Sequence, residues 1–155
     1  MAVTRIIAIR HAKVATSGLC YGRSVVPLDT SAGDAAQRMI AGTDSSDIDT
    51  VWSSPAPRCA KPARLWAASL EVPHRIDERL WELAYGRWDG LSWDAIPREE
   101  IDHWGEDWIH RSPPNGESAL DIEQRVARWV KEVPAGCHGL AAHAGVIRAL
   151  HVVLN

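Results

Sequence analysis

Short apolar stretches alternate with helix-forming segments along this chain of 155 residues. We predict strands over 6–9, 50–53, 72–76 and 139–142, and helices over 28–41, 58–70, part of 92–108, 118–133 and 146–154. This alternation is typical of a mainly parallel sheet that carries helices on both faces. The chain is therefore predicted to have an α/β fold, a three-layer αβα sandwich with a mainly parallel central sheet, in one domain spanning residues 1–155.

The first apolar stretch, Ile6 to Ile9, ends abruptly in Arg10-His11-Ala12-Lys13. Four consecutive apolar residues, three of them isoleucine, suit a central strand that is buried on both faces. Arg10 and His11 then fall at the carboxyl end of the strand, where open α/β sheets bind ligands. Solvated basic side chains at a strand end would look the same, so this motif alone leaves both interpretations open.

Two further basic positions are predicted at the same edge of the sheet, because the carboxyl ends of parallel strands meet there. Arg58 opens the helix after the second strand, where free backbone N–H groups attract anions, although a surface arginine would also fit. His143 follows the last strand. Together with Arg10, His11 and Lys13, these residues predict a site for a multiply charged anion such as a phosphoryl group.

Glu82 stands between Trp81 and Leu83. Apolar surroundings favour a protonated carboxyl, which a general acid needs, whereas a solvated loop glutamate is the ordinary alternative.

The loop over 15–29 contains Tyr21-Gly22-Arg23-Ser24 and either connects two elements or lines the ligand pocket.

Composition excludes several classes of protein. A net charge of −3 lacks the basic excess of a nucleic-acid binder. No apolar run approaches the roughly 18 residues of a membrane span, so a cytoplasmic location is expected. Cys20, Cys59 and Cys137 match neither a disulfide framework nor zinc-ligand spacing, so we expect reduced thiols and no metal site. The eight tryptophans are expected to pack in the core or on surface helices.

Several motifs occur in the order found in one enzyme family: Arg10-His11, Ser53-Ser54-Pro55 with Arg58, Glu82 before Gly86-Arg87-Trp88-Asp89-Gly90, Gly116-Glu117-Ser118, and His143 to Arg148. In these motifs the chain resembles the histidine phosphatase superfamily, which has the phosphoglycerate-mutase-like fold. Within it, the segment from Cys20 to Ser24 and the Trp-Asp-Gly stretch are most similar to alpha-ribazole phosphatases of cobalamin synthesis.

The resemblance implies a catalytic set and a substrate set. His11 would be the phosphorylated nucleophile, Arg10, Arg58 and His143 would bind phosphoryl oxygens, and Glu82 would act as general acid and then base, with no cofactor. A small-molecule phosphomonoester is the implied partner, and no nucleic acid or membrane. Its binding residues would be Tyr21, Gly22, Arg23 and Ala144, with Trp88 near the leaving group.

Three functions stay open at this point. The first is a metal-independent phosphomonoesterase, either an alpha-ribazole 5'-phosphate phosphatase or one of broad specificity. The others are a phosphoglycerate-type mutase and a non-catalytic phosphate-binding module. The oligomeric state is open as well.

The chain departs from the family pattern at two positions and at its end. The family has Gly and a hydroxyl residue where this chain has Ala12 and Val14. A methyl at residue 12 fits a negative φ, and Thr16 or Ser17 is a candidate to supply the hydroxyl. Relatives continue beyond the helix that follows His143, so the chain is expected to be either compact or truncated after Asn155.

Overall fold

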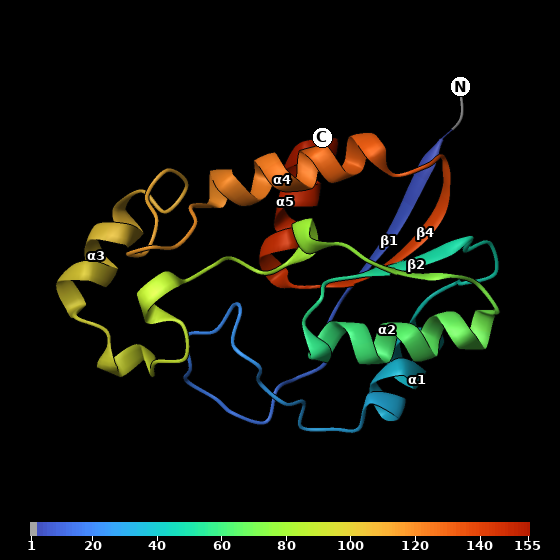
Figure 1. Ribbon diagram of the computed structural model, residues 1–155, viewed down its shortest axis with the longest axis horizontal. Coiled ribbons are helices and arrows are strands. Elements are labelled where there is room, and N and C mark those ends of the chain that lie inside the picture. The colour runs from blue at the N-terminus through green and yellow to red at the C-terminus, as the bar shows by residue number, and fades with distance from the viewer. Residues whose placement is uncertain (1–2) are drawn as a thin grey trace.

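A four-stranded sheet forms the middle layer of the computed structural model, which describes residues 3–155. The strands are β1 (Thr4–Arg10), β2 (Thr50–Ser53), β3 (His74–Ile76) and β4 (Gly136–Ala142), and all neighbours pair in parallel in the order β1-β4-β2-β3 (Figure 1). The mainly parallel sheet predicted from the alternating pattern is confirmed.

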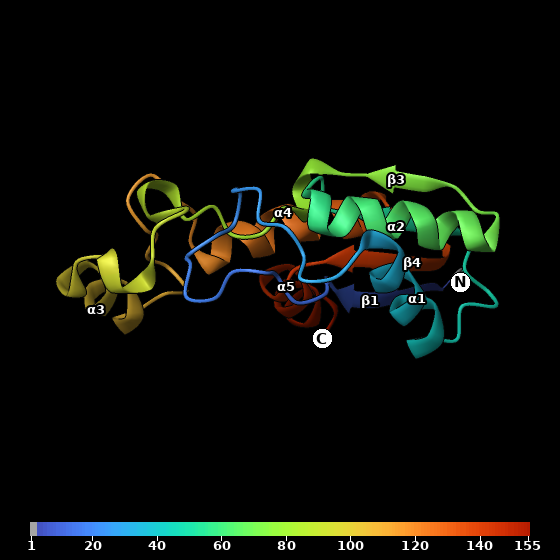
Figure 2. The same ribbon diagram turned by 90° about the horizontal axis from the view of Figure 1, so that it is seen from below.

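Helices cover both faces of this sheet. Helices α1 (Ala32–Gly42) and α2 (Pro57–Leu70) pack on one face, and α4 (Ala119–Glu132) and α5 (Ala144–Leu154) pack on the other (Figures 1 and 2). Successive strand side chains point to opposite faces, so Ile6 and Ala8 join the core under α4 and α5, whereas Ile7 and Ile9 join the core under α2. The predicted three-layer αβα sandwich is confirmed.

The ends of the helices follow local signals in the sequence. The Ser31 hydroxyl accepts a hydrogen bond from the Asp34 N–H and fixes the start of α1, four residues later than the predicted start at residue 28. Ser118 and Asp121 form a reciprocal capping box at the start of α4. Pro62 lies in the second turn of α2, where it removes one backbone hydrogen bond, and its ring is fully buried.

A second, smaller packing unit projects from the carboxyl edge of the sheet. This unit, which we call the lobe, comprises residues 84–118 with the helix α3 (Arg98–Glu106) and lies beside the loop over 15–29 (Figure 1). Its core contains Cys20, Trp88 and Ile96, and Trp104 makes T-shaped contacts with Trp88 and Tyr85.

Trp66 and Trp129 are fully buried in the two main cores, which confirms core packing as a role of the tryptophans.

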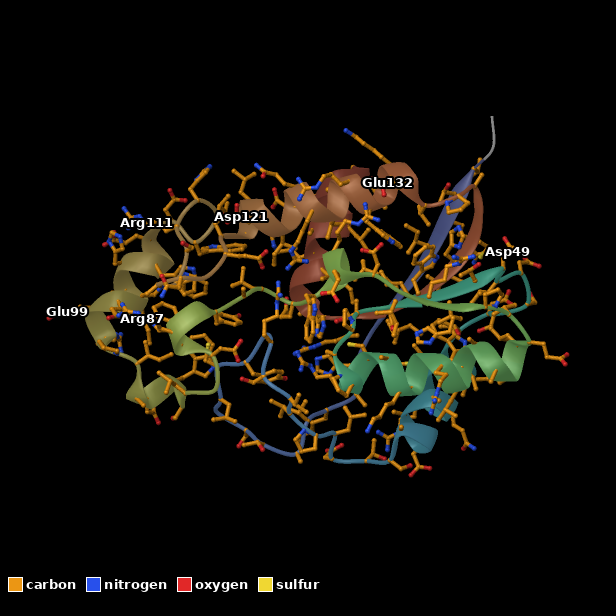
Figure 3. The ribbon with its side chains drawn as sticks, viewed as in Figure 1. Asp49, Arg87, Glu99, Arg111, Asp121 and Glu132 are labelled. Carbon is orange, nitrogen blue, oxygen red and sulfur yellow. The ribbon has the colours of Figure 1, made fainter. Side chains whose placement is uncertain are left out.

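Charged side chains gather on the outer surface of the lobe. Arg87, Glu99 and Arg111 lie there, far from the sheet (Figure 3), and α3 buries none of its residues. Helix α3 therefore presents a charged, solvated surface. Between residues 3 and 155, no helix is long and apolar enough to cross a bilayer.

Candidate active site

His11 directly follows β1, and its imidazole is buried with 8% of its surface exposed. Its Nδ1 lies 2.7 Å from the Ala12 carbonyl oxygen. A carbonyl can only accept, so Nδ1 carries the proton and Nε2 keeps a free lone pair. Burial, with a smaller contribution from Arg58 and Arg10, lowers the pKa of His11 to about 4. The ring is therefore neutral near pH 7, as a nucleophile must be.

His143 directly follows β4 as the N-cap residue of α5, and it is fully buried beside His11, with 5.4 Å between the two ring centroids. Its Nδ1 lies 3.4 Å from Arg58 Nη2 and its Nε2 lies 2.8 Å from the Ser54 hydroxyl. Arginine can only donate, so Nδ1 accepts and Nε2–H donates to Ser54. Burial and the charge of Arg58 hold the pKa of His143 well below its usual range, which keeps this imidazole neutral too.

Arg58 lies in the first turn of α2 with only 3% of its surface exposed. Its Nη1 donates to the Ser24 carbonyl over 3.1 Å and its Nη2 donates to the Gly22 carbonyl over 2.8 Å. The guanidinium also lies over the Tyr21 ring, 4.9 Å from its centroid. Among the described residues no carboxylate forms a salt bridge with Arg58, so a buried positive charge is available to an anion.

A hollow of about 290 Å³ opens in front of His11, and we call it the phosphoryl hollow. Its walls include Arg10, Lys13, Tyr21 and Val14. The cationic side chains agree with the predicted anion site. Positive φ angles among the described non-glycine residues occur at Glu71 and Asn115, so Ala12 has an ordinary backbone conformation, as expected.

Neither Thr16 nor Ser17 replaces the hydroxyl that Val14 lacks. The Val14 side chain is buried and its backbone pairs with Leu28. Thr16 and Ser17 are exposed, and neither lies among the residues that line the phosphoryl hollow. The expectation that one of them supplies the hydroxyl is wrong, because the backbone from Lys13 to Ala15 pairs with Pro27 and Asp29 and carries residues 16 and 17 away.

The Glu82 carboxylate sits at the amino terminus of α5. It accepts hydrogen bonds from the Leu83 N–H over 2.9 Å and from the Gly145 N–H over 3.3 Å. A Cβ at residue 145 would collide with Oε1 of Glu82, so any side chain there would displace the carboxylate from this position. The apolar surroundings that the sequence predicted cover only one side of Glu82. The other side of its carboxylate faces the amino terminus of α5, which is the positive end of the helix dipole.

Asp89 organises the loop that carries Tyr21, Gly22 and Arg23. Its carboxylate accepts from the backbone N–H groups of Gly22, Arg23 and Ser24 over 3.2, 2.8 and 3.1 Å. Although burial raises the pKa of Asp89, these hydrogen bonds outweigh burial and lower it below its usual range. Gly22 is needed for packing, because a Cβ there would collide with the Leu83 carbonyl.

The predicted substrate residues are not equally free to meet a ligand. The Arg23 guanidinium lies over Trp81 and donates to the Glu82 carbonyl over 3.4 Å. Trp88 has 2% of its surface exposed inside the lobe and donates its Nε1–H to Glu100. Trp88 therefore cannot reach a leaving group, and that prediction is wrong. Ala144 is exposed at the start of α5, and Tyr21 faces the phosphoryl hollow.

A buried ion pair that the sequence did not indicate holds the segment around Glu82. Arg125 donates from Nε and Nη2 to the two Glu117 oxygens, each over 3.0 Å, and from Nη2 to the Glu82 carbonyl over 3.1 Å. Glu117 in turn accepts from the Ala84 N–H over 2.9 Å. Gly116-Glu117-Ser118 stands out in the sequence as a family motif before a helix, but nothing in it indicates that Glu117 pairs with Arg125.

The thiol of Cys59 also lies at the site, but it is not a nucleophile there. The Cys59 sulfur lies 3.7 Å from His143 Nε2, but burial raises the pKa of this thiol to about 12, so it stays protonated. Cys20, Cys59 and Cys137 are all free, as expected. From residue 3 to residue 155, no group of three or more His, Cys, Asp or Glu side chains is arranged to hold a metal ion.

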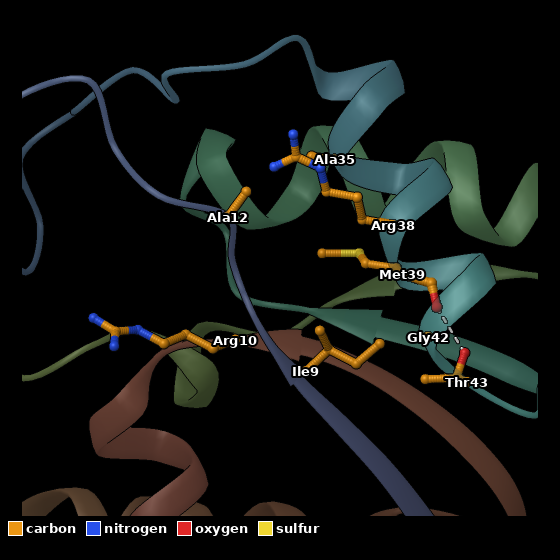
Figure 4. A pocket seen from close by; sticks show the side chains of 8 residues that line it. All are labelled: Ile9, Arg10, Ala12, Ala35, Arg38, Met39, Gly42 and Thr43. Carbon is orange, nitrogen blue, oxygen red and sulfur yellow. Dashed lines mark hydrogen bonds between the residues drawn. The ribbon is translucent and has the colours of Figure 1, made fainter.

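A further hollow, of about 220 Å³, lies between the end of β1 and α1 (Figure 4). Ile9, Ala35 and Met39 give it apolar walls, and the Arg10 guanidinium points away from it. Its lining includes no carboxylate, and its one hydroxyl, that of Thr43, donates to the Met39 carbonyl over 2.8 Å, so this hollow offers no catalytic pair.

Comparison with known proteins agrees with this geometry. The model of the histidine phosphatase superfamily (branch 1) matches residues 6–154. The adenosylcobalamin/alpha-ribazole phosphatase of Escherichia coli strain K12 is 27% identical over 155 residues, covering 94% of this chain and 76% of that protein. The alpha-ribazole phosphatase of Shigella flexneri superimposes with a TM-score of 0.83 at 29% identity, covering 97% of this chain and 79% of that one.

A mycobacterial glucosyl-3-phosphoglycerate phosphatase shares the fold, with a TM-score of 0.78 at 24% identity over 95% of this chain and 77% of that one. The phosphoglycerate-mutase-like fold expected from the sequence is confirmed by these superpositions.

Proposed function

The chain belongs to branch 1 of the histidine phosphatase superfamily, a family of hydrolases, and we propose that it hydrolyses phosphomonoesters through a phosphohistidine at His11 without a metal ion. The observation that carries this proposal is the free Nε2 lone pair of a neutral His11 beside the uncompensated charge of Arg58.

The reaction has two steps. His11 Nε2 attacks phosphorus, the bond from phosphorus to the leaving oxygen breaks, and the Glu82 carboxyl gives its proton to that oxygen. Water then attacks the phosphohistidine, Glu82 takes a proton from the water, the N–P bond breaks and inorganic phosphate leaves. Arg10 and Arg58 stabilise the charge on the phosphoryl oxygens in both steps.

His143 contributes by its position. Its Nδ1 accepts from Arg58 and its Nε2–H donates to Ser54, so it fixes one face of the guanidinium that binds the phosphoryl group. A neutral imidazole adds no charge to the cluster, so the arginines and Lys13 supply the positive charge that attracts the phosphoryl group.

Two observations support hydrolysis over the mutase and the binding module. Arg10 and Lys13 are exposed at the mouth of the phosphoryl hollow, so water can reach the phosphohistidine. A module that only binds phosphate would have no use for a carboxylate held at the start of α5. Relatives named alpha-ribazole phosphatases support alpha-ribazole 5'-phosphate as the substrate, with broad specificity as the alternative.

Steady-state turnover tests this proposal. We expect release of phosphate from alpha-ribazole 5'-phosphate and from p-nitrophenyl phosphate, unchanged by EDTA and inhibited competitively by vanadate. Turnover that EDTA abolishes and a divalent ion restores would contradict the metal-independent mechanism. Equal kcat/KM on alpha-ribazole 5'-phosphate and on small aliphatic phosphates would favour broad specificity.

A further inference from the structure

We infer that the leaving group binds in an aromatic hollow between the lobe and α5, and that this hollow selects planar, uncharged aromatic groups. The hollow has a volume of about 270 Å³, and its lining includes Glu82, Tyr85, Trp104, Trp108, Ile122 and Arg148. We call it the aromatic hollow. The inference rests on the proposed function, because it takes Glu82 to be the acid that protonates the leaving oxygen.

The position of Glu82 connects the aromatic hollow to the reaction. A general acid must lie within hydrogen-bond reach of the oxygen that it protonates. Glu82 forms part of the wall of the aromatic hollow, whereas the residues that line the phosphoryl hollow include no carboxylate. A phosphoryl group held by Arg10 and Arg58 therefore directs its ester oxygen, and the group behind it, past Glu82 toward the lobe.

The walls of the aromatic hollow suit a flat ring. Tyr85, Trp104 and Trp108 come from the lobe, and Ile122 faces them from α4. Trp104 is held by T-shaped contacts with Trp88 and Tyr85, at centroid distances of 5.7 and 6.5 Å. A surface fixed in this way before binding loses little side-chain entropy when a ligand arrives.

The charged side chains at the aromatic hollow already have partners within the protein. Arg148 lies over the Trp108 ring at 4.7 Å and donates to Glu123 over 2.6 Å. The Glu82 carboxylate is held by the Leu83 and Gly145 N–H groups. An ionic leaving group would lose its hydration here without gaining a free partner of opposite charge, so a neutral ring is favoured.

The loop over 15–29 is the segment that the sequence indicated for substrate binding, but its side chains already make contacts within the protein. Tyr21 packs under the Arg58 guanidinium, and Arg23 lies over Trp81. The aromatic hollow instead uses Trp104 and Trp108, and no sequence motif distinguishes these two from the other tryptophans.

Three phosphate esters of primary alcohols test the inference: 2-naphthylmethyl, cyclohexylmethyl and n-butyl phosphate. Their leaving oxygens are alike, so differences in kcat/KM report on binding of the group behind the oxygen. We expect the naphthylmethyl ester to exceed the other two by about tenfold, as an aromatic contact worth roughly 1.4 kcal/mol would give.

Trp108→Ala removes one aromatic wall, and Trp108→Leu replaces it with an apolar one. Trp108 has 39% of its surface exposed, and its neighbour Ile109, with 40% exposed, does not line the aromatic hollow. We expect both Trp108 variants to lower kcat/KM for the naphthylmethyl ester by about 2- to 10-fold, and for the n-butyl ester by a smaller factor, because that chain loses only an apolar contact. The control Ile109→Ala should change neither, with thermal melts verifying that each variant is folded.

The outcomes separate the inference from the proposed function. Equal turnover of the three esters by the wild type would overturn the inference and leave the proposed function standing. An equal loss on all three esters in the Trp108 variants would also overturn it, because that pattern indicates a structural role. Absence of turnover on every ester would overturn both.

Discussion

Replacing Arg125 by Met removes the cation that ties Glu117 to the segment around Glu82. The Arg125 side chain is 8% exposed and that of Glu117 is 22% exposed, so the variant leaves a largely buried carboxylate without its main partner. Breaking a buried pair from one side costs about 3–5 kcal/mol. Glu117 keeps the Ala84 N–H at 2.9 Å and a distant Arg23 at 3.6 Å, so we expect the lower end, about 3 kcal/mol.

Urea unfolding with an unchanged m-value would measure this loss, and the melting temperature should fall by about 6–12 °C. Arg128→Met is the matched control, because Arg128 is exposed on the same helix. The double variant Arg125→Met with Glu117→Gln should recover part of the loss, since its cause is an unpaired charge. An Arg125→Met protein as stable as the control would refute the reasoning.

The same pair predicts the direction of a pH effect. Hydrogen bonds from Arg125 outweigh burial and lower the pKa of Glu117 below its usual range. A carboxyl of this kind stabilises the fold above its unfolded pKa, about 4.3, and the contribution is lost as the pH falls through the folded pKa. The difference between wild type and Arg125→Met should therefore shrink in acid, which urea titrations at a series of pH values would detect.

Three further predictions concern the site. Gly145→Ala should lower kcat on alkyl phosphates by about 10²–10⁴-fold, because the methyl displaces the Glu82 carboxylate, whereas Gly42→Ala, where a Cβ meets no atom within 4 Å, should not. Asp89→Asn should raise KM several-fold with a smaller change in kcat, since it loosens the loop whose carbonyls hold Arg58; an unchanged KM would contradict this link. The acid limb of the pH profile of kcat/KM should lie near the His11 pKa of about 4. The free energy of unfolding should rise with pH between about 4 and the ordinary histidine pKa of 6.5, because in that range His11 binds a proton only in the unfolded chain.

The sheet edge was predictable because its signals are local. Each strand ends in a polar residue or is directly followed by one, and parallel pairing brings His11, Arg58 and His143 together at one edge of the sheet. The strand β4 was predicted too short, as 139–142 and not Gly136–Ala142. His138, which lies outside the predicted strand, belongs to β4, where it is buried and its Nε2 lies 2.8 Å from the Pro134 carbonyl oxygen.

The hydrogen bonds that hold the site residues in place could not be predicted, because they join residues that are far apart in the chain. Asp89 reaches the loop at Gly22, and Arg125 reaches the Glu82 carbonyl. Trp88 and Asp89 are neighbours in sequence, but the 3₁₀ turn over Gly86–Trp88 points the indole into the lobe and leaves the carboxylate for the loop. That local geometry is why the prediction for Trp88 failed.

Rapid quench of Glu82→Gln with p-nitrophenyl phosphate tests the central claim most directly. Nitrophenolate leaves without protonation, so His11 should still be phosphorylated, whereas hydrolysis of the phosphohistidine lacks its base. We predict a burst of nitrophenolate and an acid-labile, base-stable phosphoryl group on the peptide that contains His11, absent in His11→Ala. No burst and no phosphorylated peptide, or an acid-stable phosphoryl group on another residue, would contradict the phosphohistidine mechanism.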